Sequence, residues 1–264
     1  MNTDLTLKER RDKILEILHT EGKVRVVQLS ALFNVSEVSI RNDLAEMESE
    51  GLLSRVHGGA VGSYASYYHM SLAQRSGTNK ASKEAIAAKI ADMIGDQQTV
   101  MMNAGTTTLA VMHKLANKRD VTIVTNSIVL ALEGAKYPNL RVILLGGNVD
   151  YEYQYVHGTM TLKQLKEFYA DVLILSADGI DAKHGLSTYY DKEADICRQM
   201  IKQTGRVIAA LDHTKIGCVT FRSIADAQRV DCVVTTPKAD NEALEELREQ
   251  GIQIVFSDSI SERG

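Results

Sequence analysis

Apolar side chains recur at helical spacing three times within the first 60 residues. An apolar residue returns every three or four positions between Leu7 and Gly22, then over 25–33 and again over 37–50, which predicts three helices. Gly22 is the expected end of the first helix. In the second helix we expect four side chains to face inward: Val26, Leu29, Leu32 and Phe33.

Turn signals separate and follow these helices. Asn34 tolerates a left-handed backbone and predicts a tight turn, after which Ser36 is expected to cap the third helix. Residues 52–60 then read as a short strand, a turn at Gly58-Gly59 and a return strand, which predicts a β-hairpin wing. The pattern therefore favours a small winged helix-turn-helix domain.

The third helix has an unusual outer face. Ile40, Leu44 and Met47 fall on one side when each residue turns the helix by about 100°, and they form the predicted buried stripe. Short side chains occupy the opposite side, where lysine and glutamate are expected on a solvated surface: Val38, Ser39, Asn42 and Ala45. Small side chains permit close approach to a major groove, where asparagine reads adenine and an apolar group meets a thymine methyl. An ordinary surface helix in a small all-α domain is the alternative.

From Lys80 onward, strand and helix patterns alternate. Apolar runs predict buried strands at 99–102, 121–125, 141–145, 171–175, 206–211, 231–235 and 252–256. Helical stretches lie between most of them, at 82–94, 107–117, 190–204 and 239–250. This alternation predicts an α/β fold with a largely parallel sheet and helices on both faces.

The two patterns are joined by a stretch rich in serine, glycine and tyrosine that has no clear periodicity. We therefore expect a DNA-binding domain at 1–61, a linker at 62–79 and a larger α/β domain at 80–264.

Polar and glycine residues follow the predicted strands of the larger domain. Ligands bind outside the carboxyl ends of strands in such sheets, so these residues form a candidate ligand site. Hydroxyls and amide N–H groups at a helix start suit a phosphate, carboxylates suit sugar hydroxyls, and a lysine supplies positive charge. The candidate set is Asn103, Gly105, Thr106, Thr107, Thr108, Asn126, Ser127, Gly146, Gly147, Asp178, Gly179, Asp181 and Lys215. Each cluster taken alone also fits a turn or a helix cap.

Composition narrows the class of protein without identifying it. The net charge is −4, and the first 60 residues hold ten acidic against eight basic side chains, so DNA contact must come from local placement of charge. No apolar stretch approaches the roughly 20 residues of a membrane helix, and we expect a cytoplasmic protein with no membrane partner. Three separated cysteines favour neither a disulfide framework nor zinc, and no metal or cofactor is expected.

Motifs in both halves resemble the DeoR family of bacterial regulators. The first half carries Arg11 with Ile14-Leu15, Val-Ser-Glu-Val-Ser-Ile-Arg-Asn-Asp-Leu at 35–44, and Leu-Ser-Arg-Val-His-Gly-Gly-Ala at 53–60. The second half carries Asn-Ala-Gly-Thr-Thr-Thr at 103–108 and Asp-Gly-Ile-Asp at 178–181. Against the family pattern, Ser39 replaces threonine, Asn42 arginine, Asn103 aspartate and Cys197 lysine.

The resemblance implies a DNA-binding head and a sensor domain similar to ribose-5-phosphate isomerase and CoA-transferase-like folds. Such a regulator binds a double-stranded operator as a homo-oligomer, a dimer or a tetramer, and responds to a phosphorylated sugar or alditol. Repression of a carbohydrate-use operon is the family's usual behaviour. The residues expected to contact DNA are Arg11, Ser36, Val38, Ser39, Arg41, Asn42, Arg55 and His57.

Two other hypotheses stay open from the sequence. A sugar-phosphate isomerase with an accessory head would use Asp178, Asp181 and Lys215 as acid, base and electrostatic partner. An interaction protein with a degenerate site is the third hypothesis. The enzyme hypothesis leaves the outer face of the third helix unexplained, and so the regulator is favoured.

Overall fold

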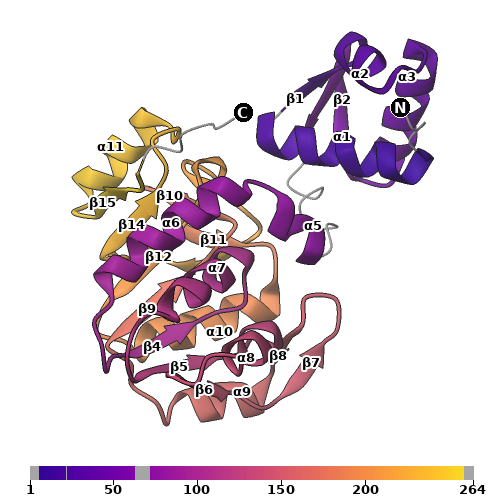
Figure 1. Cartoon of the computed structure of the whole chain (residues 1–264). Helices are drawn as coiled ribbons and strands as arrows, with labels where there is room; N and C mark the ends of the chain where they lie inside the picture. The colour runs from indigo at the N-terminus through magenta and orange to yellow at the C-terminus, as the bar shows by residue number, and fades with distance from the viewer. Residues whose placement is uncertain (1–5, 22, 63–71, 259–264) are drawn as a thin grey trace. The chain divides into compact units, whose positions relative to one another are not determined.

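A computed structural model describes residues 6–21, 23–62 and 72–258. The chain divides into two compact units, Met1–Thr78 and Asn79–Gly264 (Figure 1). Part of the expected linker is helical, because Leu72–Gly77 forms helix α5. The rest of that stretch, residues 63–71, and the expected helix end at Gly22 lie outside the described residues.

The first unit holds the three predicted helices and a small antiparallel sheet. The helices are α1 (Leu7–Glu21), α2 (Val26–Phe33) and α3 (Glu37–Ser49). The strands are β1 (Lys23–Arg25), β2 (Leu53–Val56) and β3 (Gly59–Gly62), in the order β1-β3-β2. The winged helix-turn-helix pattern is thus present. Strand β1 was not predicted, because three residues are too few to show alternation.

Local signals end α2 and start α3 as expected. Asn34 has a φ of 54°, in the left-handed region, and the Ser36 hydroxyl accepts a hydrogen bond from the Ser39 N–H at 3.1 Å. The predicted stripe of α3 is buried in a core that brings the three helices together: Ile14, Leu18, Leu29, Ile40, Leu44 and Met47. The inward placement of Leu32 was wrong, since this side chain is 63% exposed.

The wing turns one residue earlier than the sequence suggested. Val56 pairs with Gly59, so the two turn residues are His57 and Gly58, and Gly59 already belongs to β3. Gly58 has a φ of 75°, which glycine adopts without strain. At Gly59, a Cβ would lie 2.0 Å from the backbone oxygen of Val24. That position therefore needs glycine because β1 and β3 approach closely.

The second unit is built on one parallel sheet of seven strands, all of which the sequence predicted. In spatial order they are β15 (Gln253–Phe256), β14 (Cys232–Thr235), β12 (Val207–Ala210), β9 (Val172–Leu175), β4 (Thr99–Met102), β5 (Val121–Thr125) and β6 (Leu140–Leu144). The chain adds β5 and β6 on one side of β4, then returns to add the other strands beyond its opposite side. Strand order therefore reverses between β4 and β9, where α/β sheets place ligands.

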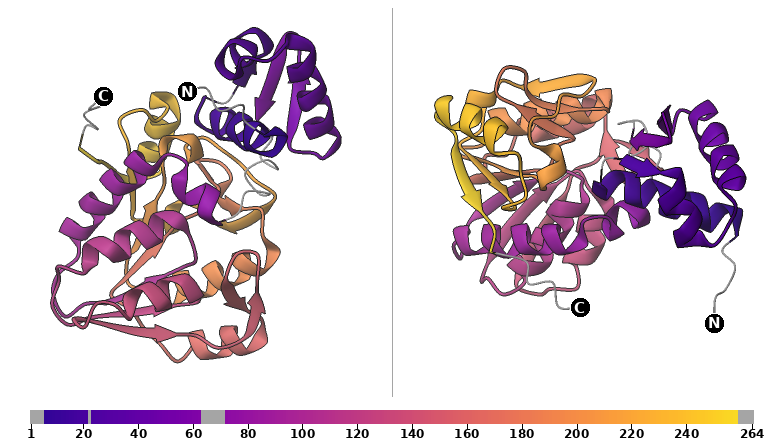
Figure 2. Two further views of the ribbon diagram at one scale, coloured as in Figure 1. Left: turned by 45° about the vertical axis from the view of Figure 1, so that its right-hand side comes forward. Right: turned by 90° about the horizontal axis from the view of Figure 1, so that it is seen from above.

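Helices cover both faces of this sheet (Figures 1 and 2). One apolar core joins the sheet to α6 (Lys80–Met93), α7 (Thr106–Leu115) and α8 (Ile128–Gly134). The core on the other face joins it to α9 (Thr159–Leu165), α10 (Asp191–Lys202) and α11 (Asn241–Glu249). Because apolar cores lie on both sides, the inner strands β14, β12, β9, β4 and β5 are almost entirely buried and read as continuous apolar runs, whereas the edge strands β6 and β15 are partly exposed.

Short antiparallel elements decorate the sheet and were not predicted. A hairpin joins β7 (Asn148–Asp150) to β8 (Tyr155–His157), and a three-stranded sheet contains β10 (Gly179–Asp181), β11 (Gly185–Thr188) and β13 (Arg222–Ala225). Single 3-10 turns follow at η1 (His213–Lys215) and η2 (Ala227–Arg229). Elements of three or four residues are too short for periodicity to reveal.

The two adjacent glycines of the wing give a matched test of this packing. We expect Gly59→Ala to lower the unfolding free energy of the first unit by about 1–3 kcal/mol or more, since the added methyl collides with backbone. Gly58→Asn is the control, because a Cβ at Gly58 meets nothing within 4 Å and asparagine tolerates positive φ. Hydrogen exchange across residues 7–62 measures both; equal loss of protection in the two variants would contradict the assignment.

Candidate functional site

The outer face of α3 is exposed as its sequence pattern indicated. Val38 is 63% exposed, Asn42 is exposed and Ser39 is half-buried. The hydroxyl of Ser36 is engaged as the helix cap. The exposed Val38 lies one helical turn before the amide of Asn42, which can both donate and accept a hydrogen bond. This face offers the short, partly apolar surface that a major groove accepts.

Arg41 and Arg55 line one hollow of about 270 Å³ beside this face, together with Val56 and the wing glycines. Each arginine is paired in the free protein. Arg41 contacts Glu37 one turn earlier, and the Arg55 Nε donates to Glu48 at 2.7 Å. The hydrogen bonds from Arg55 lower the pKa of Glu48 below its ordinary value. A DNA phosphate must therefore compete with a glutamate for each guanidinium.

Arg11, another predicted DNA contact, lies on α1. It pairs with Glu46 and approaches Asp43 and Glu50 at 3.8 Å, and the hydrogen bond to Glu46 raises its pKa. The neighbouring Arg10 donates to the buried Asp43 at 2.6 Å. These pairs fasten α1 to α3. In the free protein the Arg11 guanidinium is engaged by carboxylates, as those of Arg41 and Arg55 are, and its contact with DNA stays a prediction.

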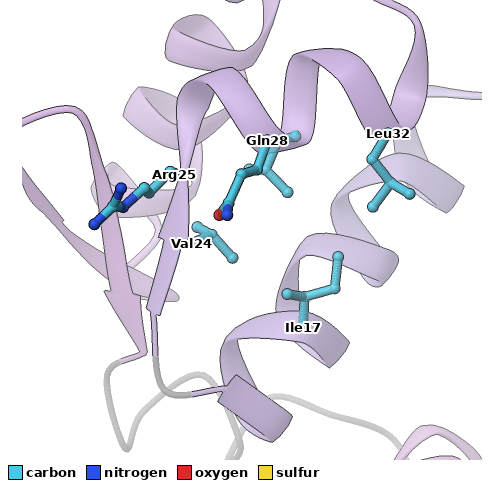
Figure 3. Close-up of a pocket in the computed structure, with 6 residues that line it drawn as sticks. Ile17, Val24, Arg25, Gln28 and Leu32 are labelled. Carbon is cyan, nitrogen blue, oxygen red and sulfur yellow. The ribbon is translucent and has the colours of Figure 1, made fainter.

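A second hollow lies between α1, β1 and α2 (Figure 3). Its volume is about 240 Å³, and the side chains around it are mostly apolar: Ile17, Val24, Arg25, Gln28, Leu29 and Leu32. A single cationic side chain and no hydroxyl face this space. The hollow therefore has neither the polar groups for a sugar nor the charge for a phosphate.

In the second unit, Asn103 joins the ends of β4 and β9 where strand order reverses. Its Oδ1 accepts from the Ser176 N–H, and its Nδ2 donates to the Ser176 carbonyl, both at 2.9 Å. A Cβ at Gly105 would lie 2.1 Å from the Ser176 hydroxyl. The Thr108 hydroxyl reaches the carbonyls of Asn103 and Gly105 at 2.9 Å. The loop before α7 is thus held close to the end of β9.

Two carboxylates lie beside this junction. Glu193, in the first turn of α10, accepts from the Asn103 Nδ2 at 3.0 Å, and Asp178 accepts from the Thr188 hydroxyl at 2.9 Å and from the Tyr189 N–H at 3.1 Å. The same Thr188 hydroxyl lies 3.4 Å from Glu193. Glu193 and Thr188 were absent from the candidate set. Only the fold brings the Glu193 carboxylate to the ends of β4 and β9.

Asp178 lies within electrostatic reach of a further charged residue, Lys215. Burial and the charge of Asp178 raise the pKa of Tyr189, while the charge of Lys215 lowers it, so all three lie within electrostatic reach. Asp212 is almost fully buried, and burial alone would raise its pKa. Lys215, the Thr214 hydroxyl and Lys83 outweigh that effect and hold the pKa of Asp212 below its ordinary value. The structure thus gathers Asn103, Gly105, Asp178 and Lys215 from the predicted set.

The remaining candidates have local partners. The Asp181 carboxylate caps the β10–β11 turn: burial raises its pKa, but hydrogen bonds from His184 and Lys183 outweigh burial and lower it. A Cβ at Gly179 would lie 2.3 Å from the Cys218 carbonyl, so this glycine permits close backbone packing. Thr107 is buried and Thr106 half-buried in the first turn of α7.

The loops after β5 and β6 are held by the β7–β8 hairpin and α9. Ser127 caps α8, and the Asn126 Nδ2 donates to the Val156 carbonyl at 3.2 Å. The Gly146 N–H donates to Gln164, and a Cβ at Gly147 would lie 2.1 Å from the Thr161 hydroxyl. The buried Oδ1 of Asn126 has no hydrogen-bond partner among the described residues, which leaves an acceptor for a ligand.

Family models match both units. The model of the DeoR-like helix-turn-helix domain matches residues 10–63, and that of the DeoR C-terminal sensor domain matches residues 78–236. The HTH-type transcriptional regulator GolR of Listeria innocua is 31% identical over 95% of this chain and 98% of its own. The putative aga operon transcriptional repressor of Escherichia coli O157:H7 is 31% identical over 94% and 93%, and the glycerol-3-phosphate regulon repressor of Escherichia coli K12 is 30% identical over 93% and 97%.

Among solved structures, ribose 5-phosphate isomerase from Plasmodium falciparum aligns with a TM-score of 0.38 and 18% identity, over 50% of this chain and 51% of that one. Across residues 6–21, 23–62 and 72–258, no helix combines the length and apolar character of a membrane span.

The amide at position 103 gives a test of the junction. In Asn103→Asp, two carboxylates would lie about 3 Å apart, which raises the pKa of the pair. A raised pKa in the folded state makes the loss of stability small near pH 4 and larger as pH rises towards neutrality. Urea unfolding at several pH values measures this trend, with Asn117→Asp, at an exposed amide outside the junction, as the amide-to-acid control. A pH-independent difference from wild type would contradict the Asn103–Glu193 contact.

Proposed function

This chain belongs to the DeoR family of transcriptional regulators, and from that premise we propose that its affinity for an operator is set by a phosphorylated sugar or sugar alcohol. It is a DNA-binding regulator with a sensor domain, and not an enzyme. The observation that carries the proposal is the exposed face of α3, whose Val38, Ser39 and Asn42 suit a major groove and little else. A sugar-phosphate isomerase has no use for such a face.

We place the DNA surface on α3 and the wing. Asn42 is the proposed reader of a base, because an exposed amide can both donate to and accept from adenine. Val38 is proposed to contact a thymine methyl. Arg41, Arg55 and the wing residue His57 are proposed to contact phosphates, which set register without reading sequence. The local pairing of both arginines with glutamates makes non-specific attraction weak, in keeping with the acidic balance of the first 60 residues.

The effector is proposed to bind at the carboxyl ends of the strands in the second unit. The start of α7, with Gly105, Thr106 and Thr107, offers backbone N–H groups and hydroxyls to an anion. Asp178 and the neighbouring Glu193 accept from hydroxyls within the protein, and a polyol supplies further donors. The similarity to repressors named for the aga operon and the glycerol-3-phosphate regulon supports a phosphorylated sugar or alcohol as the class.

Paired heads complete the proposal. A helix-turn-helix dimer binds half-sites about 34–36 Å apart, so we propose a homo-oligomer, a dimer or a tetramer, that acts as a repressor in the cytoplasm. An effector alters this binding only if it favours one arrangement of the chains over another. The alternative enzyme hypothesis needed Asp181 as an acid or base, but this carboxylate caps a turn.

Asn42→Ala tests the base-reading role. We expect it to weaken specific DNA binding by about 1–3 kcal/mol while non-specific binding stays near its wild-type value. Gln28→Ala is the matched control, since Gln28 is an exposed amide on α2 beside the hollow of Figure 3. Fluorescence anisotropy with an operator fragment and a shuffled fragment separates the two kinds of binding. Equal losses on both fragments would remove Asn42 from base reading.

The effector hypothesis is tested on the full chain. The upstream region of its own gene is the first DNA fragment, assayed with glycerol 3-phosphate, ribose 5-phosphate, fructose 1-phosphate and galactosamine 6-phosphate. We expect one of these compounds to shift DNA affinity severalfold, and its unphosphorylated parent to shift it less. Specific DNA binding that no compound changes would overturn the sensing proposal, whereas isomerisation of one compound would overturn the assignment as a regulator.

A further inference from the structure

We propose that Asn103 and Cys197 form a matched neutral pair that holds the Glu193 carboxylate in place at the candidate ligand site. In this role Cys197 is a positioning residue, because it acts on the effector only through the amide and the carboxylate beside it. The consequence for the effector rests on the proposed function. The pairing itself is a property of the folded chain, and it can be measured without any ligand.

One buried amide links two side chains of α10. The Asn103 Nδ2 lies 3.6 Å from the Cys197 sulfur and 3.0 Å from Glu193 Oε1. Glu193 and Cys197 are four residues apart, so one turn of the helix presents both to the end of β4. Asn103 and Cys197 are fully buried, and water therefore does not compete for the contact between them. The direction of the amide is set by Ser176, whose N–H and carbonyl bind its two ends.

Both members of the pair are uncharged. The amide of Asn103 does not titrate. Burial and the charges of Glu193 and Asp178 raise the pKa of the Cys197 thiol well above its ordinary value, so the thiol stays protonated. An aspartate at position 103 would instead set a further carboxylate against Glu193. Only a cation within the same contact would offset that repulsion.

Both positions depart from the DeoR pattern, which has aspartate at the first and lysine at the second. The fold brings them into contact, although 94 positions separate them along the chain. Aspartate and lysine carry opposite charges, and the amide and thiol carry none, so either combination leaves the contact neutral. A combination of aspartate with the thiol leaves a negative charge facing Glu193. The two departures are therefore one coupled change at a single contact.

The coupled change alters what surrounds Glu193. Its carboxylate accepts from Asn103 and lies 3.4 Å from the Thr188 hydroxyl, which also donates to Asp178 at 2.9 Å. A lysine at position 197 would place an ammonium group one helical turn from Glu193, where it would compete with effector hydroxyls for the carboxylate. The thiol does not compete in this way. The Asn103 amide thus keeps Glu193 turned towards the ends of β4 and β9, where the effector is proposed to bind.

A double-mutant cycle measures the pairing without ligand. Urea unfolding of the full chain at neutral pH compares the effect of Asn103→Asp in three backgrounds: wild type, Cys197→Lys and Cys197→Met. Lysine supplies a cation at the contact, and methionine fills a similar volume without charge. We expect Asn103→Asp to lower the folding equilibrium constant about tenfold less in the lysine background than in the other two. Equal losses in all three backgrounds would overturn the pairing.

Milder variants test the positioning of Glu193, since a buried lysine can prevent folding. Isothermal titration with the sugar phosphates of the preceding experiment compares Cys197→Ala, Cys197→Ser and the control Cys232→Ala, which truncates another fully buried thiol on β14. We expect Cys197→Ala to weaken binding of the best compound about 3- to 10-fold, because the amide loses an acceptor that steadies its hydrogen bond to Glu193. Cys197→Ser keeps an acceptor and should bind nearly as wild type does.

The outcomes separate this inference from the proposed function. Wild-type affinity in Cys197→Ala, or an equal loss in Cys232→Ala, would overturn the positioning role of Cys197 and leave the sensing function intact. Absence of binding by the wild type to every sugar phosphate would overturn the sensing function and, with it, the ligand role of Cys197. The unfolding cycle would then still decide whether Asn103 and Cys197 are paired.

Discussion

The hydrogen bonds between the side chain of Asn103 and the backbone of Ser176 fix the junction on which the candidate ligand site depends. These bonds pair polar groups in the loops that directly follow β4 and β9. The two strands are neighbours in the sheet, and the strand order reverses between them. Because Asn103 also donates to Glu193, the same amide sets the position of a carboxylate from α10. An acid here would face Glu193 with like charge. The neutral amide instead donates a hydrogen bond to that carboxylate.

Charge is arranged differently in the two units. In the first unit, Arg41 and Arg55 lie at the surface and are paired with glutamates, which would limit attraction to DNA of any sequence. In the proposed complex, specificity then depends on the shape and hydrogen bonding of α3. In the second unit, lysines and carboxylates are buried together, where water screens them little. The presence of a single phosphate on a small ligand would therefore change its binding energy strongly at such a site.

Both the outer face of α3 and the candidate ligand site of the second unit are positioned by close packing rather than by exposed charge. Asp43, on the inner side of α3, is buried and accepts a hydrogen bond from Arg10 of α1, so the orientation of α3 is set from its inner side. Gly59 plays a similar part in the wing, because only its missing side chain allows β1 to pair with β3. These residues touch neither proposed ligand, yet they decide where Val38 and Asn42 point.

The sequence by itself determined the elements: three helices and a wing in the first unit, seven buried strands in the second, and most polar residues at the strand ends. Periodicity and turn chemistry act over a few residues, and so they can be recognised from the sequence alone. The inward placement of Leu32 was wrong and Glu193 was missed, because the surroundings of both side chains come from segments far away in sequence. Only the tertiary structure decided which strand-end residues meet, since strand order and helix packing bring Asn103, Ser176 and Glu193 together. The short antiparallel strands were also decided by the tertiary structure, because three residues show too little alternation and form a strand only with their partners.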